Sequence, residues 1–167
     1  MKKLITLFLI FSTLCIMAQK TSKELNEKYH QFDFWLGKWD VYKYGTDVLA
    51  GKSNIESIID SIGLLENYSN LKGTSVGKSL NKYNAAKERW EQYWIDNSGG
   101  TLHLTGKLAD GKMVMNDAEY GDSKSGLNQI VWEKMKNGSV RQTWSLSKDG
   151  GKTWSVLFDG EYKRTKS

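Results

Sequence analysis

Most of the chain alternates between apolar and polar positions. In one segment Leu102 and Leu104 alternate with Thr101, His103 and Thr105. Period-two alternation is typical of a β-strand with one buried face. Repeated along the chain, it predicts about ten strands, over residues 38–44, 51–60, 64–70, 75–83, 89–96, 101–108, 112–120, 127–135, 139–147 and 153–163.

Short turns separate the predicted strands, and proline is absent from the chain. Asp110-Gly111, Asn137-Gly138 and Asp149-Gly150 are hairpin signals, because type I′ turns require positive φ at both central residues. Residues 22–30 have helical spacing instead. Ten strands joined by short turns curl or split rather than stay flat, and closure removes both exposed edges. The pattern therefore predicts an all-β protein, an antiparallel up-and-down β-barrel of about ten strands with a short N-terminal helix.

The first residues have the composition of a secretory signal peptide. Lys2 and Lys3 precede an apolar run over residues 4–17, and Ala18 provides a small residue for cleavage. The run is shorter than the roughly 20 residues that span a bilayer. We expect cleavage after Ala18, a secreted or periplasmic protein, and a single barrel domain over residues 19–167 without a membrane span.

Composition excludes several classes of function. Cleavage removes Cys15, the only cysteine, which excludes thiol catalysis, disulfides and cysteine metal ligands in the remaining chain. It also removes Lys2 and Lys3 and lowers the formal charge from +5 to +3. The other basic residues are scattered, whereas nucleic-acid binding requires a clustered basic footprint. We expect no nucleic-acid partner.

The segment FDFWLGKWDV, residues 32–41, places Gly37 and Trp39 at the start of the first predicted strand. This Gly-x-Trp element, after a helical segment, resembles that of lipocalins and other calycins. The resemblance implies that Trp39 closes one end of the barrel beneath a basic side chain from a late strand. Arg164 is the first candidate for that side chain, and Arg141 is the second.

A wider resemblance covers nearly all of residues 29–163. It rests on the segments FDFWLGKWDV, NIESIID, RWEQYWID, TLHLTGKLADGKMVM and VRQTWSLSKDGGKTWSVLFDGEY. These segments are similar to a family of secreted bacterial proteins described as calycin-like β-barrels of unknown function. The resemblance implies the fold and export from the cytoplasm, and it implies no reaction and no catalytic residue.

The segment SKDGGKTW, residues 147–154, fits the pattern Ser-x-Asp-x-Gly-x-Thr-Trp. It resembles the Asp box of sialidases and related β-propellers, where the motif recurs on every blade. This chain has one copy and no blade repeat. Since the Asp carboxylate can accept turn N–H groups and glycine tolerates positive φ, we expect a structural hairpin between the last two strands.

Aromatic and amide side chains share several predicted strand faces. If these faces point inward, the barrel encloses a space suited to a small apolar molecule. The expected ligand-binding residues are Trp90, Gln92, Trp94, Met113, Trp132, Gln142 and Trp144, with Glu56, Glu66 or Arg141 as polar anchors. Arg141 has two alternatives, a solvated outer position or an inner position that selects a carboxylate. The alternative for the whole set is an interior completely filled by these side chains.

Candidate catalytic chemistry is sparse. His103 is the one strand histidine and a weak candidate for a haem or metal ligand, and no other grouping has metal-ligand spacing. We expect no catalytic residue, no cofactor and no metal. The leading interpretation is a barrel that binds a small apolar ligand. The alternatives are an isomerase, cyclase or hydrolase using the same cavity, and a packed barrel that acts as an envelope interaction module.

Overall fold

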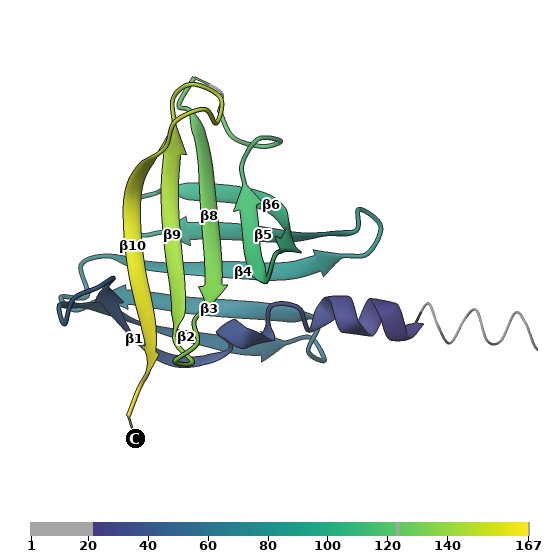
Figure 1. Cartoon of the computed structure of the whole chain (residues 1–167), viewed down its shortest axis with the longest axis horizontal. Coiled ribbons are helices and arrows are strands. Elements are labelled where there is room, and N and C mark those ends of the chain that lie inside the picture. The colour runs from purple at the N-terminus through teal and green to yellow at the C-terminus, as the bar shows by residue number, and fades with distance from the viewer. Residues whose placement is uncertain (1–21, 123, 167) are drawn as a thin grey trace, which may run out of the picture.

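The computed structural model describes residues 22–122 and 124–166 (Figure 1). The predicted signal peptide lies outside these residues. The described chain begins with a helix over residues 22–29, followed by a short 3₁₀ helix, η1, at Asp33–Trp35. No helix within the described residues is long and apolar enough to cross a membrane.

Ten strands follow the helical segment and close into one barrel. They are β1 (Gly37–Lys43), β2 (Leu49–Ile58), β3 (Gly63–Asn70), β4 (Val76–Asn84), β5 (Arg89–Asp96), β6 (Thr101–Ala109), β7 (Lys112–Asn116), β8 (Leu127–Lys134), β9 (Val140–Ser147) and β10 (Ser155–Arg164). Each strand pairs antiparallel with the next, and β1 pairs with β10. The predicted antiparallel up-and-down barrel with a short N-terminal helix is confirmed.

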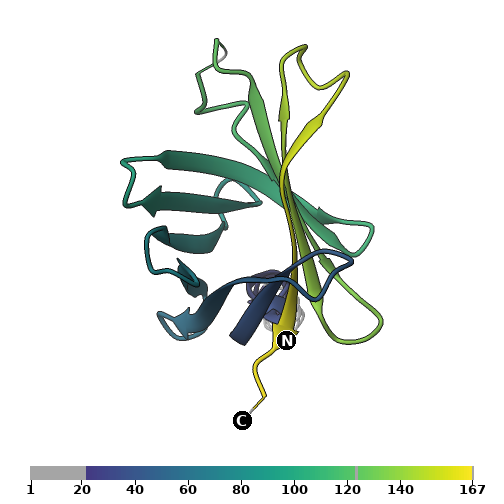
Figure 2. The same ribbon diagram turned by 90° about the vertical axis from the view of Figure 1, so that its left-hand side faces the viewer.

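The barrel is strongly twisted. Figures 1 and 2 show β8, β9 and β10 crossing the direction of β2 to β6, so that two parts of one closed sheet face each other. Along each strand alternate side chains point inward, as the period-two pattern predicts. In β4, for example, Gly77, Ser79 and Asn81 are buried while Lys78 and Leu80 are exposed.

Strand β7 is shorter than predicted. It ends at Asn116, whereas the sequence pattern predicted a strand to residue 120. The cause is Asp117, whose carboxylate accepts hydrogen bonds from the backbone N–H and the side-chain amide of Asn128, both at 2.7 Å. These bonds hold Asp117 against the start of β8 and send the following residues into a loop.

The segment predicted from its Asp-box pattern forms the turn between β9 and β10. Asp149 accepts hydrogen bonds from the backbone N–H groups of Lys152 (3.0 Å) and Thr153 (2.8 Å), and from the Thr153 hydroxyl (2.7 Å). These bonds lower the pKa of Asp149 to about 2. Trp154 donates its indole N–H to Gly151 O within the same turn. The predicted hairpin role is confirmed.

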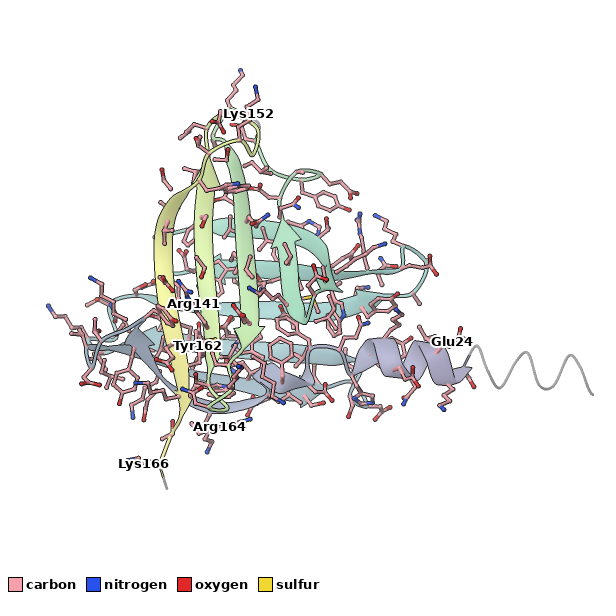
Figure 3. The ribbon with its side chains drawn as sticks, viewed as in Figure 1. Glu24, Arg141, Lys152, Tyr162, Arg164 and Lys166 are labelled. Atoms are coloured by element: carbon pink, nitrogen blue, oxygen red, sulfur yellow. The ribbon has the colours of Figure 1, made fainter. Side chains whose placement is uncertain are left out.

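In the Gly-x-Trp element, Trp39 lies beneath a basic side chain from the last strand, and this side chain is Arg164, the first candidate. Trp39 and Arg164 are paired residues on β1 and β10, and the guanidinium carbon lies 3.9 Å from the centre of the indole ring. Arg164 also donates a hydrogen bond of 2.6 Å to Leu36 O. Gly37 has φ of 122°, and a Cβ there would lie 1.8 Å from Arg164 Nη1, so a side chain at this position would displace the guanidinium. Figure 3 shows Arg164 near the C-terminal end of β10.

Replacing Arg164 with methionine tests this contact. Arg164→Met keeps an unbranched stem but removes the charge above Trp39 and the bond to Leu36, so we expect the free energy of unfolding to fall by about 1–3 kcal/mol. Urea denaturation measures the change. Lys166→Met, which removes an exposed charge two residues away, is the matched control and should change stability little. Equal effects of the two substitutions would contradict the assigned role of Arg164.

Candidate functional site

An aromatic plug fills one part of the barrel interior. It consists of Phe32 and Trp35, which enter from η1, and Trp90 and Trp132 from β5 and β8. Phe32 stacks on Trp35 with ring centres 5.0 Å apart, and it meets Trp90 and Trp132 edge-on at 5.6 and 5.2 Å. All four side chains have 0 % exposure. The barrel is therefore packed in this part, with no room for a ligand.

A second part of the interior is hollow. The hollow has a volume of about 280 Å³, close to the lower end of the range of small-molecule sites. Its apolar walls come from β5, β6, β8, β9 and β10, and its polar groups come mainly from β3, β5, β9 and β10. The lining residues are Glu66, Tyr68, Ser75, Gln92, Trp94, Asp96, Leu102, Ile130, Gln142, Trp144, Leu157, Phe158 and Tyr162. The interior is thus not completely filled by the side chains of the strands.

Glu66 is the buried carboxyl group of this hollow, with only 3 % of its surface exposed. Its two oxygens accept hydrogen bonds from the hydroxyls of Ser53 on β2 and Ser79 on β4, each at 3.0 Å. Ser79 is the cross-strand partner of Glu66 itself, and Ser53 is the partner of Tyr68, the next inward residue of β3, so the inward faces of β2, β3 and β4 align. Burial raises the pKa of Glu66 to about 7, and the two serine bonds oppose this rise.

A chain of amides continues from the serines across the floor of the hollow. Asn81 donates to Ser79 Oγ at 2.9 Å and accepts from the Gln92 amide at 2.8 Å. On the opposite wall, Tyr162 donates its hydroxyl proton to Gln142 Oε1. Burial raises the pKa of Tyr162 well above its usual value, and the nearby Glu66 adds to the effect. Tyr162 therefore stays neutral across the physiological range.

The two tryptophans of the hollow are held by their indole N–H groups. Trp144 donates to Asn128 Oδ1 at 2.9 Å, and Trp94 donates to Asp96 Oδ2 at 3.3 Å. Gly77 makes room for Trp94, since a Cβ on Gly77 would lie 2.1 Å from the indole ring. Because both N–H groups are bonded within the protein, the tryptophans offer the hollow apolar ring surface.

Five of the residues predicted from the sequence line the hollow. They are Gln92, Trp94, Gln142, Trp144 and Glu66. Three others are placed differently from the prediction. Trp90 and Trp132 belong to the aromatic plug, and Met113 is fully buried in the core outside the hollow. They do point inward, but they lie at a depth where packed side chains leave no space.

Two predicted polar anchors lie outside the barrel. Glu56 is exposed, because its neighbour Ile55 takes the inward position on β2. Arg141 binds Asp159 through two hydrogen bonds of 2.9 and 2.7 Å and lies 3.7 Å from the ring centre of Tyr44. The outer alternative for Arg141 is correct, and the inner one that would select a carboxylate is wrong.

Sequence reasoning missed several residues of the site. Tyr68 follows Glu66 at the next inward position of β3, so the same alternation that singled out Glu66 could have included it. Phe158 and Tyr162 share the inward face of β10 with Gly160, but the register shift between Val156 and Phe158 interrupts the pattern there. Phe32 and Trp35 carry no strand periodicity, so their entry into the barrel had no such signal.

A larger hollow of about 680 Å³ lies along the first five strands, and we do not assign function to it. Six of its fourteen lining residues are exposed to solvent, among them Lys38, Lys52 and Lys78. The inner hollow differs in having a fully buried carboxyl group and an apolar aromatic wall. Convergent polar groups in an apolar pocket are typical of ligand sites, which favours the inner hollow.

His103 faces away from the interior. Its ring stacks on Tyr120 with centres 3.8 Å apart and meets Tyr93 edge-on at 5.7 Å. Its neighbours Leu102 and Leu104 take the inward positions. A haem or metal ligand inside the barrel therefore cannot be His103. Within residues 22–122 and 124–166, no three His, Cys, Asp or Glu side chains converge as a metal site would require.

Comparison with models of known protein families gives no match for the chain, and comparison with curated proteins gives no significant match. The site therefore has to be interpreted from its own chemistry.

The raised pKa of Glu66 predicts a pH-dependent stability. The folded state keeps the Glu66 proton up to about pH 7, whereas the unfolded chain loses it near 4.5, so this contribution to stability is lost as pH rises through 7. Between pH 5 and 8, wild type should lose about 2–3 kcal/mol relative to Glu66→Gln, which cannot ionise. Urea denaturation of both proteins at the two pH values measures the difference, in which all other titrating groups cancel. A constant difference would contradict the assignment.

Proposed function

We propose that this protein is a calycin-like barrel that binds one small, largely apolar molecule in the hollow beside the aromatic plug. The observation that carries the proposal is the hollow itself: apolar walls from Trp94, Trp144 and Phe158 surround a few polar groups held in place by hydrogen bonds. Such a combination gives affinity through apolar burial and orientation through the polar groups. The internal volume argues against the alternative of a fully packed barrel that acts only as an interaction module.

Reversible binding fits the site better than catalysis. The hollow has one buried carboxyl group, Glu66, and no described histidine, lysine or arginine lines it. Many acid–base mechanisms pair one such group with a second group able to exchange a proton at neutral pH. Tyr162 does not provide it, because its pKa is far above neutrality and its proton is already donated to Gln142. A single carboxyl group among bound hydroxyls and amides is suited to recognition of a ligand.

Binding of phenethyl alcohol, a neutral amphipathic probe, tests this function. Calorimetry should detect binding at one site, with a matching change in tryptophan emission. Trp144→Ala should weaken binding tenfold or more, since loss of one aromatic wall removes about 1.5 kcal/mol or more of apolar contact. Trp154→Ala is the matched control, because Trp154 lies in the β9–β10 turn outside the hollow. Equal losses in both variants, or no binding to wild type, would refute the proposed site.

We also propose that the protein is exported. Lys2 and Lys3, the apolar run after them and Ala18 have the order found in secretory leaders. The intact mass of the protein recovered from its own cells should correspond to a chain that begins at Gln19. Replacing Ala18 with a bulky residue should block cleavage and leave the longer mass. Recovery of the uncleaved wild-type chain from the cytoplasm would contradict export.

A further inference from the structure

The charged side chains that line the hollow, among the described residues, are all acidic. Glu66 and Asp96 line it, and no lysine, arginine or histidine of the described residues does. The two arginines nearest in the sequence to its walls are engaged elsewhere, Arg141 with Asp159 on the outer surface and Arg164 above Trp39. Figure 3 labels Arg141, which is on β9, and Arg164, which is on β10 together with Tyr162. A ligand carboxylate would therefore meet Glu66 without a compensating cation.

Among residues 22–122 and 124–166, no basic side chain pairs with Glu66. Its hydrogen bonds come from two neutral serine hydroxyls, so its negative charge, when present, is buried and uncompensated. A buried carboxylate is stabilised strongly by a cation that reaches it. The protein provides none in the hollow, and the space beside Glu66 is open to a ligand.

From this arrangement we propose that the ligand is an amine, with its ammonium group at Glu66 and its apolar part against the aromatic walls. The inference rests on the proposed binding function and specifies the ligand class. An ammonium has three donor hydrogens and no acceptor. The hollow offers matching acceptors: the free lone pairs of Glu66, the Tyr162 hydroxyl oxygen, and Gln92 Oε1, which accepts no hydrogen bond from the described residues although only 2 % of Gln92 is exposed.

The aromatic side chains support the same ligand class. Trp94, Trp144, Tyr68 and Phe158 line one hollow together with Glu66. The electron-rich face of an aromatic ring attracts a cation, most strongly where water is excluded. The indole N–H groups of Trp94 and Trp144 are bonded to Asp96 and Asn128. The two tryptophans therefore present no donor that would compete with an ammonium.

Binding of an amine should depend on pH through Glu66. The titratable groups that face it are Tyr68 on its own strand, Tyr162 on β10 and Asp96 at the edge of the hollow; β2 and β4 contribute the serines. Both tyrosines have raised pKa values, and hydrogen bonds, chiefly from Ser98, lower the pKa of Asp96. Glu66, with a pKa of about 7, is therefore the group of the hollow that changes charge between pH 5.5 and 8.

The test compares three probes that share a phenyl ring and differ in the polar group: phenethylamine, phenethyl alcohol and phenylacetate. At pH 8 the amine should bind at least about tenfold more tightly than the alcohol, and phenylacetate should bind more weakly than either. Lowering the pH to 5.5 should weaken amine binding about tenfold or more, because Glu66 becomes protonated, and should leave alcohol binding unchanged.

Glu66→Gln separates this inference from the binding function. Glutamine keeps the size of the side chain and can still bond Ser53 and Ser79, so the variant should lose both the preference for the amine over the alcohol and the pH dependence of amine binding. Glu56→Gln, the same substitution on the outer surface of β2, is the control and should change neither.

Three results would overturn the inference. Equal affinity for amine and alcohol at pH 8 would agree with the binding function but would contradict the inference that the ligand is an amine. Affinity for the alcohol that rises as the pH falls, and is lost in Glu66→Gln, would show that protonated Glu66 donates to an acceptor on the ligand. Failure of all three probes to bind wild type would reject the binding function together with the inference.

Discussion

The entry of Phe32 and Trp35 into the barrel is the contact on which the rest of the structure depends. A closed ten-strand sheet encloses more space than its own inward side chains fill without gaps. η1 supplies two large rings that pack against Trp90 and Trp132, and each such aromatic contact adds about 0.5–1.5 kcal/mol beyond apolar burial. The plug closes one part of the interior and thereby defines where the hollow begins.

The boundary between plug and hollow is also where the interior changes from apolar to polar. Glu66, Ser79, Asn81 and Gln92 form a hydrogen-bonded series there, on the same inward faces that hold apolar side chains elsewhere. Burying these groups costs stability even when they are bonded to one another, and an apolar layer would pack more favourably. The stability of the barrel therefore does not explain a polar layer at the floor of a cavity, whereas the proposed binding of a ligand does.

Period-two alternation predicted the strands, their order and which side chains share a face, because these properties follow from local backbone geometry. It could not predict which inward-facing side chains lie in the packed part of the interior and which line the hollow. Trp90 and Trp94 lie on one face of β5, yet Trp90 is in the plug and Trp94 lines the hollow. The difference arises from Phe32 and Trp35, which are distant in sequence from β5. Likewise, the position of Arg141 depended on which face of β9 turned inward, and only the closed barrel settles that.

Arg141 and Glu66 differ in burial and in whether an opposite charge compensates them. Arg141 is paired with Asp159 on the outer surface, where solvent screens the pair and its loss would leave little uncompensated charge. Glu66 is buried without an opposite charge, and its pKa is near neutrality for that reason. Under the proposed binding function, such a charge at the edge of an open internal space would distinguish ligands by their charge. The aromatic plug determines where that space lies, and Glu66 determines the chemistry that it favours.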